Sequence, residues 1–163
     1  MSTNEEIASL YSQYVMNPYA PSLTLVSGKG CKVKDADRMQ YLDFTGGIAV
    51  QATGHCHPKV VSAIQDQAQT LVHCSNLFYN VNQCLLAKKL SEIGLGGKAF
   101  FCNSGAEANE AAIKLARRWG SQNGGRYEIV TMRNSFHGRT LATVTATASP
   151  RASRAVVLAV GAG

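Results

Sequence analysis

Apolar residues recur at helical spacing in four segments of the chain, and polar residues occupy the positions between them. In the first segment, Ile7, Leu10 and Tyr14 fall on one face of a helix that Thr3 or Asn4 would cap. The other three segments begin after turn residues and are long enough to form helices. The predicted helices cover about residues 5–16, 58–71, 81–93 and a segment from 106 through at least 119.

Short runs of strand-forming residues lie between these helices. Near the N-terminus, runs at 23–26, 31–35 and 39–43 predict a small antiparallel unit. Two further apolar runs, Ala99–Cys102 and Glu128–Met132, read as strands, and each ends in a polar turn. Because ligands collect at the carboxyl ends of strands in an open α/β sheet, we expect both turns to line one crevice.

The first polar turn, Cys102–Glu107, joins a predicted strand to the start of a predicted helix. The first N–H groups of a helix have no intrahelical partner, and the helix dipole favours an anion beside them. Ser104 offers a hydroxyl there, and Gly105 lets a ligand come close to the backbone. A plainer interpretation is also open, in which Ser104 or Asn103 only caps the helix.

The second polar turn, Asn134–Thr140, combines an aromatic ring, a glycine and a guanidinium. Phe136 offers a flat apolar face, and Arg139 has a planar fork that suits a carboxylate or a phosphate. The set suits an aromatic phosphate ester whose substrate bears a carboxylate. Arg139 at a helix start could instead pair with a glutamate or a backbone carbonyl, and His137 could be either a general base or a packing residue.

Four motifs, in this order and spacing, resemble the class III aminotransferases, which depend on pyridoxal 5′-phosphate (PLP). The resemblance extends from about Leu10 to Thr147. It implies an α/β fold, the PLP-dependent transferase fold type I, with an incomplete large domain after a small N-terminal unit of helix and antiparallel strands. The motifs are Phe44–Val50, Gly54–Pro58, Phe101–Ala111 and Phe136–Thr140.

The resemblance also implies roles for individual residues. Ser104, Gly105 and Ala106 match the segment that binds the cofactor phosphate, with Ser104 beside the binding backbone. Phe136 matches the residue that stacks on the cofactor ring, and Arg139 matches the arginine that binds the α-carboxylate of the substrate. The segment Ser75–Tyr79 resembles one near the dimer interface and the active site, without a firm role for any of its residues.

Within the family, the resemblance is nearest to the members that act on acetylornithine. It implies transfer of the δ-amino group of N-acetylornithine to 2-oxoglutarate, in arginine biosynthesis, by a cytoplasmic homodimer. Relatives that act on ornithine, succinylornithine or 4-aminobutyrate give an alternative interpretation. A further alternative, of a different class, is a non-catalytic remnant that binds PLP or phosphate, or that dimerises through an incomplete sheet.

The Schiff-base lysine that holds PLP in this family cannot be identified in the chain, so no catalytic residue is assigned. In the family this lysine and the acid that partners the cofactor ring lie well downstream of the Phe136–Thr140 motif. No lysine follows Phe136, and the charged pair Lys88 and Lys89 is typical of a solvated helix face. We therefore expect no transamination by this chain alone. Its lysines are Lys29, Lys32, Lys34, Lys59, Lys88, Lys89, Lys98 and Lys114.

The resemblance and the composition of the last residues divide the chain into three parts. Residues 1–50 form the predicted N-terminal segment, and residues 51–148 form a truncated PLP-binding large domain. Residues 149–163 form an atypical tail, rich in Ala, Val and Arg and without acids or aromatics, that we expect not to be native to the fold. A reading-frame slip near Ala148 explains this tail better than a divergent natural end. We expect a partial large domain to leave apolar faces uncovered and to aggregate.

The net charge of +6 comes from 16 basic and 10 acidic residues. The basic residues are scattered, without a basic run or interleaved aromatics, which argues against nucleic-acid binding. The apolar stretch Val156–Val160 is far shorter than the roughly 20 residues that span a membrane. The first residues show neither a secretory signal nor an Arg-rich transit peptide, so we expect a cytoplasmic protein without membrane contact.

Five cysteines, an odd number without paired spacing, favour reduced thiols in the cytosol over disulfides. The groups His55-Cys56-His57 and His73-Cys74 contain the residue types that bind zinc. Adjacent residues on one turn rarely converge on one ion, and no Cys-x-x-Cys pair accompanies them. We therefore expect no metal site.

Overall fold

The computed structural model describes residues 3–147, and the predicted tail at 149–163 lies outside that range. The chain divides into two compact units, Met1–Phe78 and Tyr79–Gly163, and each unit is described by itself. The predicted boundary between residues 50 and 51 concerns the complete family fold, and it stays a prediction.

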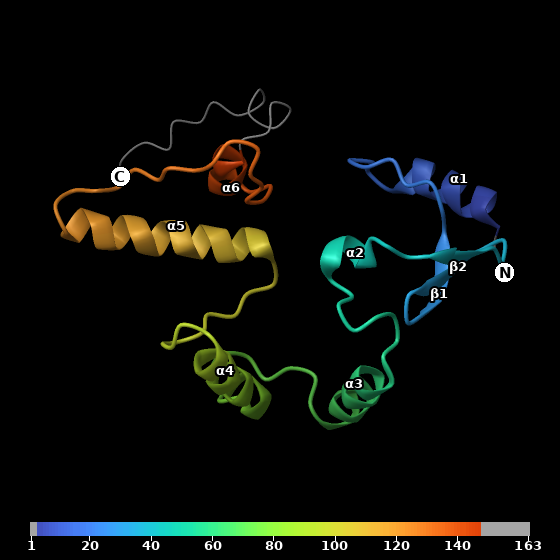
Figure 1. The fold of residues 1–163 in the computed structure, drawn as a ribbon, viewed down its shortest axis with the longest axis horizontal. Helices are drawn as coiled ribbons and strands as arrows, with labels where there is room; N and C mark the ends of the chain where they lie inside the picture. The colour runs from blue at the N-terminus through green and yellow to red at the C-terminus, as the bar shows by residue number, and fades with distance from the viewer. Residues whose placement is uncertain (1–2, 148–163) are drawn as a thin grey trace. The chain divides into compact units, whose positions relative to one another are not determined.

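The first unit contains a three-stranded antiparallel sheet in the order β1-β2-β3 (Figure 1). The strands are β1 (Leu25–Lys29), β2 (Lys32–Asp35) and β3 (Gln40–Leu42), and Val33 of β2 lies opposite Tyr41 of β3. The predicted antiparallel N-terminal unit is confirmed. The first strand starts two residues later than the sequence pattern indicated and runs on to the hairpin turn.

The N-terminal helix α1 (Asn4–Tyr14) begins at a capping box, in which the side chains of Thr3 and Glu6 each accept the other residue's backbone N–H. Thr3 is therefore the cap, and Asn4 is free to bind the sheet. The helix ends two residues earlier than predicted, because Val15 has extended backbone dihedrals.

Asp35, at the end of β2, joins α1 to the sheet. Its buried carboxylate accepts hydrogen bonds from Asn4 Nδ2 at 3.0 Å, Tyr41 Oη at 2.9 Å and the Met39 N–H at 2.8 Å. Burial raises the pKa of the Asp35 carboxyl, but the hydrogen bonds outweigh burial and hold that pKa below its ordinary value. Asp35 is therefore an ionised, fully bonded anchor between the helix and the strands.

The next elements follow the sequence pattern closely. α3 (Pro58–Thr70) has proline at its start, and α4 (Val81–Ile93) is capped by the Asn80 side chain. Both predicted helices are confirmed to within one residue. Between β3 and α3, the short irregular helix α2 (Gly46–Ala49) was not predicted.

The second unit also contains α5 (Gly105–Gln122) and α6 (Leu141–Ala146), and α6 packs beside α5 (Figure 1). α5 confirms the helix predicted from Ala106. At its C-terminal end Gly120 is buried, and a Cβ at this position would collide with the Arg126 carbonyl. This close approach lets the chain turn back after α5 and run towards the second polar turn.

The strands predicted at Ala99–Cys102 and Glu128–Met132 are wrong for this chain: neither segment forms a β-strand in the structure. A strand is defined by the hydrogen bonds of its neighbours, and neither segment has a paired neighbour within the described residues. The apolar runs are those of a buried parallel sheet, but that sheet does not form here.

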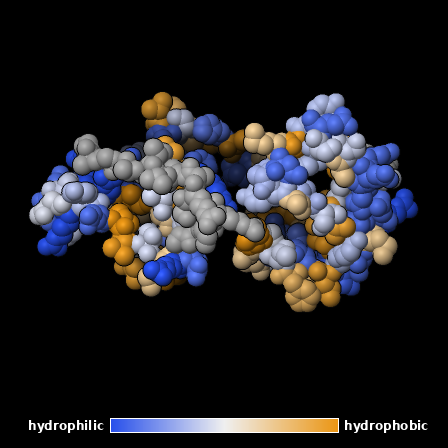
Figure 2. Space-filling model, turned by 90° about the horizontal axis from the view of Figure 1, so that it is seen from above, coloured by the Kyte–Doolittle hydropathy of each residue, from blue (hydrophilic) through white to orange (hydrophobic). Residues whose placement is uncertain are grey.

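Apolar side chains are mostly exposed in both units. Within residues 3–147 the buried apolar side chains are Val33 and Ala146, which are 5% and 8% exposed, whereas Phe44 and Ile48 are each 92% exposed. Figure 2 shows hydrophobic residues interspersed with hydrophilic ones on the surface that it displays. The expected uncovered apolar faces are thus present. Within the described part of the chain, no helix is both long and apolar enough to cross a membrane.

Candidate functional site

The first polar turn forms a capped helix start. Ser104 is the N-cap of α5, and its Oγ accepts the Glu107 N–H at 3.2 Å. The Glu107 carboxylate in turn accepts the Asn103 N–H at 2.5 Å. The capping interpretation of Ser104 is therefore confirmed, and it does not exclude a ligand, because it satisfies only one of the free N–H groups.

The backbone N–H groups of Gly105 and Ala106, the first two residues of α5, remain available to a ligand. Within the described residues neither has a hydrogen-bond acceptor. A Cβ added at Gly105 would have no atom within 4 Å, so open space lies beside this glycine. Two unpaired N–H groups at the positive end of an 18-residue helix, next to open space, can hold an anion.

The second polar turn packs directly against this helix start. Gly138 is buried and has φ +137°, and a Cβ there would lie 2.8 Å from the Ala106 Cβ and 2.5 Å from the Thr143 Oγ1. No larger residue fits without displacing α5 or α6. The glycine therefore brings Phe136 and Arg139, its near neighbours in sequence, to the first turn of α5.

Side chains from α5 fix the second turn in place. The Asn109 Nδ2 donates to the His137 carbonyl at 2.7 Å. The Glu110 carboxylate accepts the Ala142 N–H at 3.2 Å and also the Thr140 hydroxyl. The His137 ring lies 3.4 Å from the Ser135 hydroxyl, a weak local contact that supports the packing interpretation over the general base.

Phe136 and Arg139 lie together on the exposed side of this turn. The Arg139 Cζ is 5.1 Å from the centroid of the Phe136 ring, a cation–π distance. Phe136 is 66% exposed, and within the described residues Arg139 forms no ion pair. The alternative in which Arg139 pairs with a glutamate is therefore not seen in this part of the chain, and both groups are accessible to a ligand.

A separate polar cluster lies in the first unit around Asp43 and His55. The His55 Nε2 is 2.7 Å from the Asp43 Oδ2, so this imidazole pairs with a carboxylate and does not face the neighbouring Cys56 and His57 as a ligand set. The structure brings together no group of three potential metal ligands within residues 3–147. The residues of the zinc hypothesis thus do not converge there.

The segment Ser75–Tyr79 is exposed, and Tyr79 is 100% exposed. Ser75 has φ +63°, and its Oγ accepts the Leu77 N–H at 3.2 Å, which makes a tight local turn. Nothing in the described residues gives this segment a role, and its place near a dimer interface stays a prediction.

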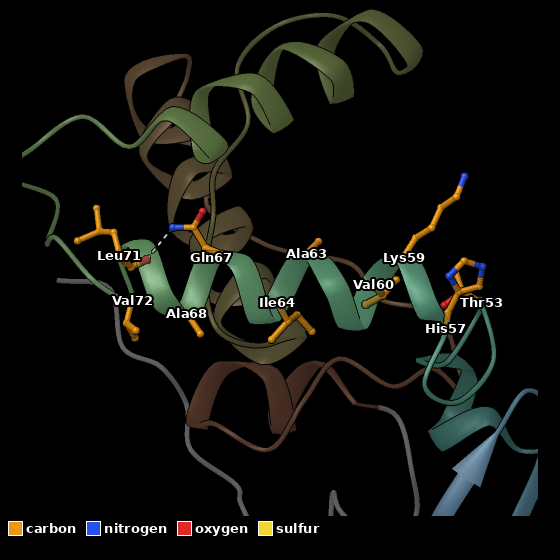
Figure 3. Close-up of a pocket in the computed structure, with 10 residues that line it drawn as sticks. All are labelled: Thr53, His57, Lys59, Val60, Ala63, Ile64, Gln67, Ala68, Leu71 and Val72. Atoms are coloured by element: carbon orange, nitrogen blue, oxygen red, sulfur yellow. Dashed lines mark hydrogen bonds between the residues drawn. The ribbon is translucent and has the colours of Figure 1, made fainter.

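An apolar groove runs along α3 (Figure 3). Val60, Ile64 and Ala68 line it along the helix, and His57 lies at its N-terminal end. The groove contains none of the predicted site residues, all of which belong to the second unit. Its apolar lining is that of a helix face that packs against protein.

A helix start with two N–H groups that have no acceptor within the described residues, beside an exposed aromatic ring and an exposed guanidinium, has the chemistry that suits a phosphorylated aromatic ligand. The family profile for class III aminotransferases matches residues 14–160, and the chain belongs to this PLP-dependent family. The fold is accordingly that of the PLP-dependent transferases of fold type I, of which this chain has a partial N-terminal region.

Two curated relatives are acetylornithine aminotransferases. The one from Caldanaerobacter subterraneus is 54% identical over 83% of this chain, and the one from Methanocaldococcus jannaschii is 56% identical over 79%. The chain spans only 35% and 33% of their respective lengths. Among solved structures, the ornithine aminotransferase of Toxoplasma gondii matches 93% of this chain and 37% of its own, with a TM-score of 0.84 and 28% identity.

Sequence reasoning missed three residues that hold the two turns together: Asn109, Glu110 and Thr147, whose Oγ1 accepts the His137 N–H at 2.9 Å. One signal was available for the first two. Both follow Ala106 at helical spacings of three and four, so they lie on the face of α5 that carries Ala106. Polar residues on an interior helix face need partners, and the second turn provides them.

Proposed function

We propose that this chain supplies the N-terminal part of an acetylornithine aminotransferase. In that reaction the δ-amino group of N-acetylornithine passes to 2-oxoglutarate. One observation carries the proposal: Gly138 packs on Ala106, so the unpaired amides of α5 and the Phe136–Arg139 pair belong to one rigid site. The identity to two acetylornithine aminotransferases supports the choice of substrate.

In this proposal each residue contacts a different part of the cofactor or substrate. The Gly105 and Ala106 N–H groups bind the phosphate of PLP, with Ser104 beside them, and open space at Gly105 admits the phosphate oxygens. The exposed ring of Phe136 covers one face of the cofactor ring. When bound, PLP supplies the electron sink for transamination.

Arg139 binds the α-carboxylate of N-acetylornithine through its planar fork. The amine that reacts is on the δ-carbon, at the other end of the substrate. Arg139 therefore orients the substrate and takes no part in the bond changes. Its cation–π contact with Phe136 holds the guanidinium next to the surface that covers the cofactor, which links substrate position to cofactor position.

The family resemblance implies that the Schiff-base lysine and the acid that partners the cofactor ring lie downstream of the Phe136–Thr140 motif, and the chain spans only 35% and 33% of the lengths of its two relatives. We infer that this chain alone does not transaminate. The complete protein is proposed to act as a cytoplasmic homodimer.

The test is a chimera in which residues 1–147 replace the matching N-terminal third of the Methanocaldococcus jannaschii enzyme. We expect 2-oxoglutarate-dependent turnover that is faster with N-acetylornithine than with ornithine, succinylornithine or 4-aminobutyrate. Arg139→Met in the same chimera is the matched variant, and it should lose turnover while it keeps bound PLP. A folded, PLP-containing chimera that prefers another donor would overturn the choice of substrate.

A further inference from the structure

A side-chain hydrogen bond from Asn109 connects the face of α5 that carries Ala106 to the backbone at His137. It lies one turn beyond Ala106 on the helix that starts at the phosphate-binding turn, and it is half-buried. Its Nδ2 donates to the His137 carbonyl at 2.7 Å, across 28 residues of sequence. A short bond between partly buried groups so distant in sequence fixes one segment relative to the other.

The other side of His137 is held by Thr147, the C-cap residue of α6. The His137 N–H donates to the Thr147 Oγ1 at 2.9 Å, and the Thr147 hydroxyl donates to the Thr143 carbonyl at 2.8 Å. Both backbone polar groups of His137 are thus bound by side chains, one from α5 and one from Thr147, the residue that follows α6. The residues that flank it, Phe136 and Gly138, therefore have little freedom to rotate.

We propose that Asn109 is a positioning residue for cofactor binding, and that its amide holds the Phe136–Arg139 segment in register with the Gly105 and Ala106 amides. The inference rests on the proposed function, since it concerns how one ligand, PLP, meets both parts of the site. Without the Asn109 bond, the phosphate-binding amides would persist as part of α5, whereas Phe136 would lose its fixed place over the ligand ring.

The chemistry requires an amide at this position. The His137 carbonyl accepts a hydrogen bond, so a donor must face it. Asn109→Asp preserves the size of the side chain but turns a carboxylate oxygen towards that carbonyl, which repels it. Asn109→Gln retains the donor on a longer chain. Comparison of Asn109→Asp with Asn109→Gln therefore separates the effect of losing the hydrogen bond from the effect of altered packing.

The experiment measures how the 163-residue chain binds two probes, PLP and inorganic phosphate, by equilibrium dialysis. We expect Asn109→Asp to weaken PLP binding about tenfold, the scale of one lost aromatic contact, and to leave phosphate binding within about twofold. Phe136→Ala should give the same loss, and the double variant should lose no more. Asn109→Gln should recover part of the affinity for PLP.

The control is Asn123→Asp, the same substitution at the other end of α5, where the Asn123 amide donates to Trp119. Asn123→Asp should leave the binding of both PLP and inorganic phosphate unchanged. If Asn109→Asp binds PLP as tightly as the unaltered chain, the inference is wrong. It is also wrong if phosphate binding falls as much as PLP binding, because the substitution would then act on the helix start.

A second measurement needs no ligand. Hydrogen–deuterium exchange of the peptide spanning residues 134–142 should accelerate in Asn109→Asp, while exchange in 112–120 of α5 stays unchanged. If the unaltered chain binds neither probe, the proposed cofactor site fails and the role of Asn109 in cofactor binding fails with it, and the exchange measurement then tests only whether Asn109 fixes the segment 134–142. Unchanged exchange at 134–142 would overturn the role of Asn109 whatever the binding results.

Discussion

The Nε2 of His55 lies 2.7 Å from the Oδ2 of Asp43, and this pair fastens the loop before α3 to the strand hairpin. The His55 backbone pairs with Gly30 through two hydrogen bonds of 2.9 Å. The other carboxylate oxygen of Asp43 accepts the N–H groups of Thr45 and Gly46, each at 2.9 Å. The Asp43 carboxylate therefore joins its own turn at Thr45 and Gly46 to the His55 loop, and the His55 backbone bonds this loop to Gly30 of the hairpin.

This arrangement predicts a pH dependence of stability for the first unit. The hydrogen bond from His55, followed by those from Thr45 and Gly46, holds the pKa of Asp43 far below its ordinary value of 3.8. A depressed folded-state pKa adds stability above the unfolded-state pKa, and this stability is lost as pH falls below it. In urea unfolding at pH 6, Asp43→Asn should have a lower free energy of unfolding than the unaltered chain. This difference in free energy should become smaller below about pH 4.

The matched control for that series is Asp66→Asn. Asp66 is exposed on α3. Among the described residues, its carboxylate accepts only a long contact of 3.4 Å from the Ser62 hydroxyl. Asp66→Asn should change the free energy of unfolding only slightly, and by the same amount at pH 6 and at pH 3. A constant difference between Asp43→Asn and the unaltered chain from pH 6 to pH 3 would show that the Asp43 carboxylate does not stabilise the fold.

Gly138→Ala should destabilise the second unit. The new Cβ would collide with Ala106 and Thr143, and the positive φ adds backbone strain, for a total of about 2–4 kcal/mol. Gly96→Ala is the control, because Gly96 has φ +76° but no atom within 4 Å of its added Cβ. In urea unfolding, Gly96→Ala should lower the free energy of unfolding by about 1 kcal/mol, because only backbone strain is added. Equal losses at the two positions would contradict the packing of Gly138 on α5.

Arg139→Lys tests the guanidinium fork. The substitution keeps the positive charge and removes the bidentate geometry. In the chimera, the KM for N-acetylornithine should rise about tenfold or more, while the PLP content stays the same. Lys114→Met, a charge change on an exposed part of α5, should leave KM unaltered. An Arg139→Lys enzyme with normal KM would remove this residue from substrate binding.

The purified 163-residue chain should show no turnover of N-acetylornithine with 2-oxoglutarate, even with excess PLP. Its lysines all precede Phe136, and the Schiff-base lysine of the family lies downstream of that residue. The measurement is glutamate formation by chain purified from a host that lacks aminotransferases of this class. Turnover that follows the chain through purification would show that another of its lysines does the chemistry.

The helices could be predicted from the sequence because each carries its own signals. Pro58 starts α3, Asn80 caps α4 and Ser104 caps α5, and all three act within a single turn of backbone. The strands at 99–102 and 128–132 could not be predicted correctly in the same way. Their apolar character is local, whereas strand pairing depends on neighbours elsewhere in the chain.

In the candidate site, too, local features could be predicted from the sequence, whereas contacts between distant residues could not. The motifs and the chemistry of the side chains predicted the candidate residues Ser104, Gly105, Ala106, Phe136 and Arg139, and their roles stay predictions. The bond from Asn109 to His137 could not, because it joins residues 28 positions apart and depends on the close packing at Gly138. Periodicity places Asn109 on the correct face of α5, but it does not name the segment that covers this face.

The most direct test of the account is saturable binding of PLP by the 163-residue chain, compared with Gly105→Asp. An acidic residue in the first turn of a helix is favourable for the helix, so this variant should keep its circular dichroism spectrum. It also puts a carboxylate into the open space where the phosphate would bind. We predict saturable binding by the unaltered chain and none by Gly105→Asp. Equal binding by both, or no binding by a chain whose helices are intact, would contradict the central claim that these two turns form the cofactor site.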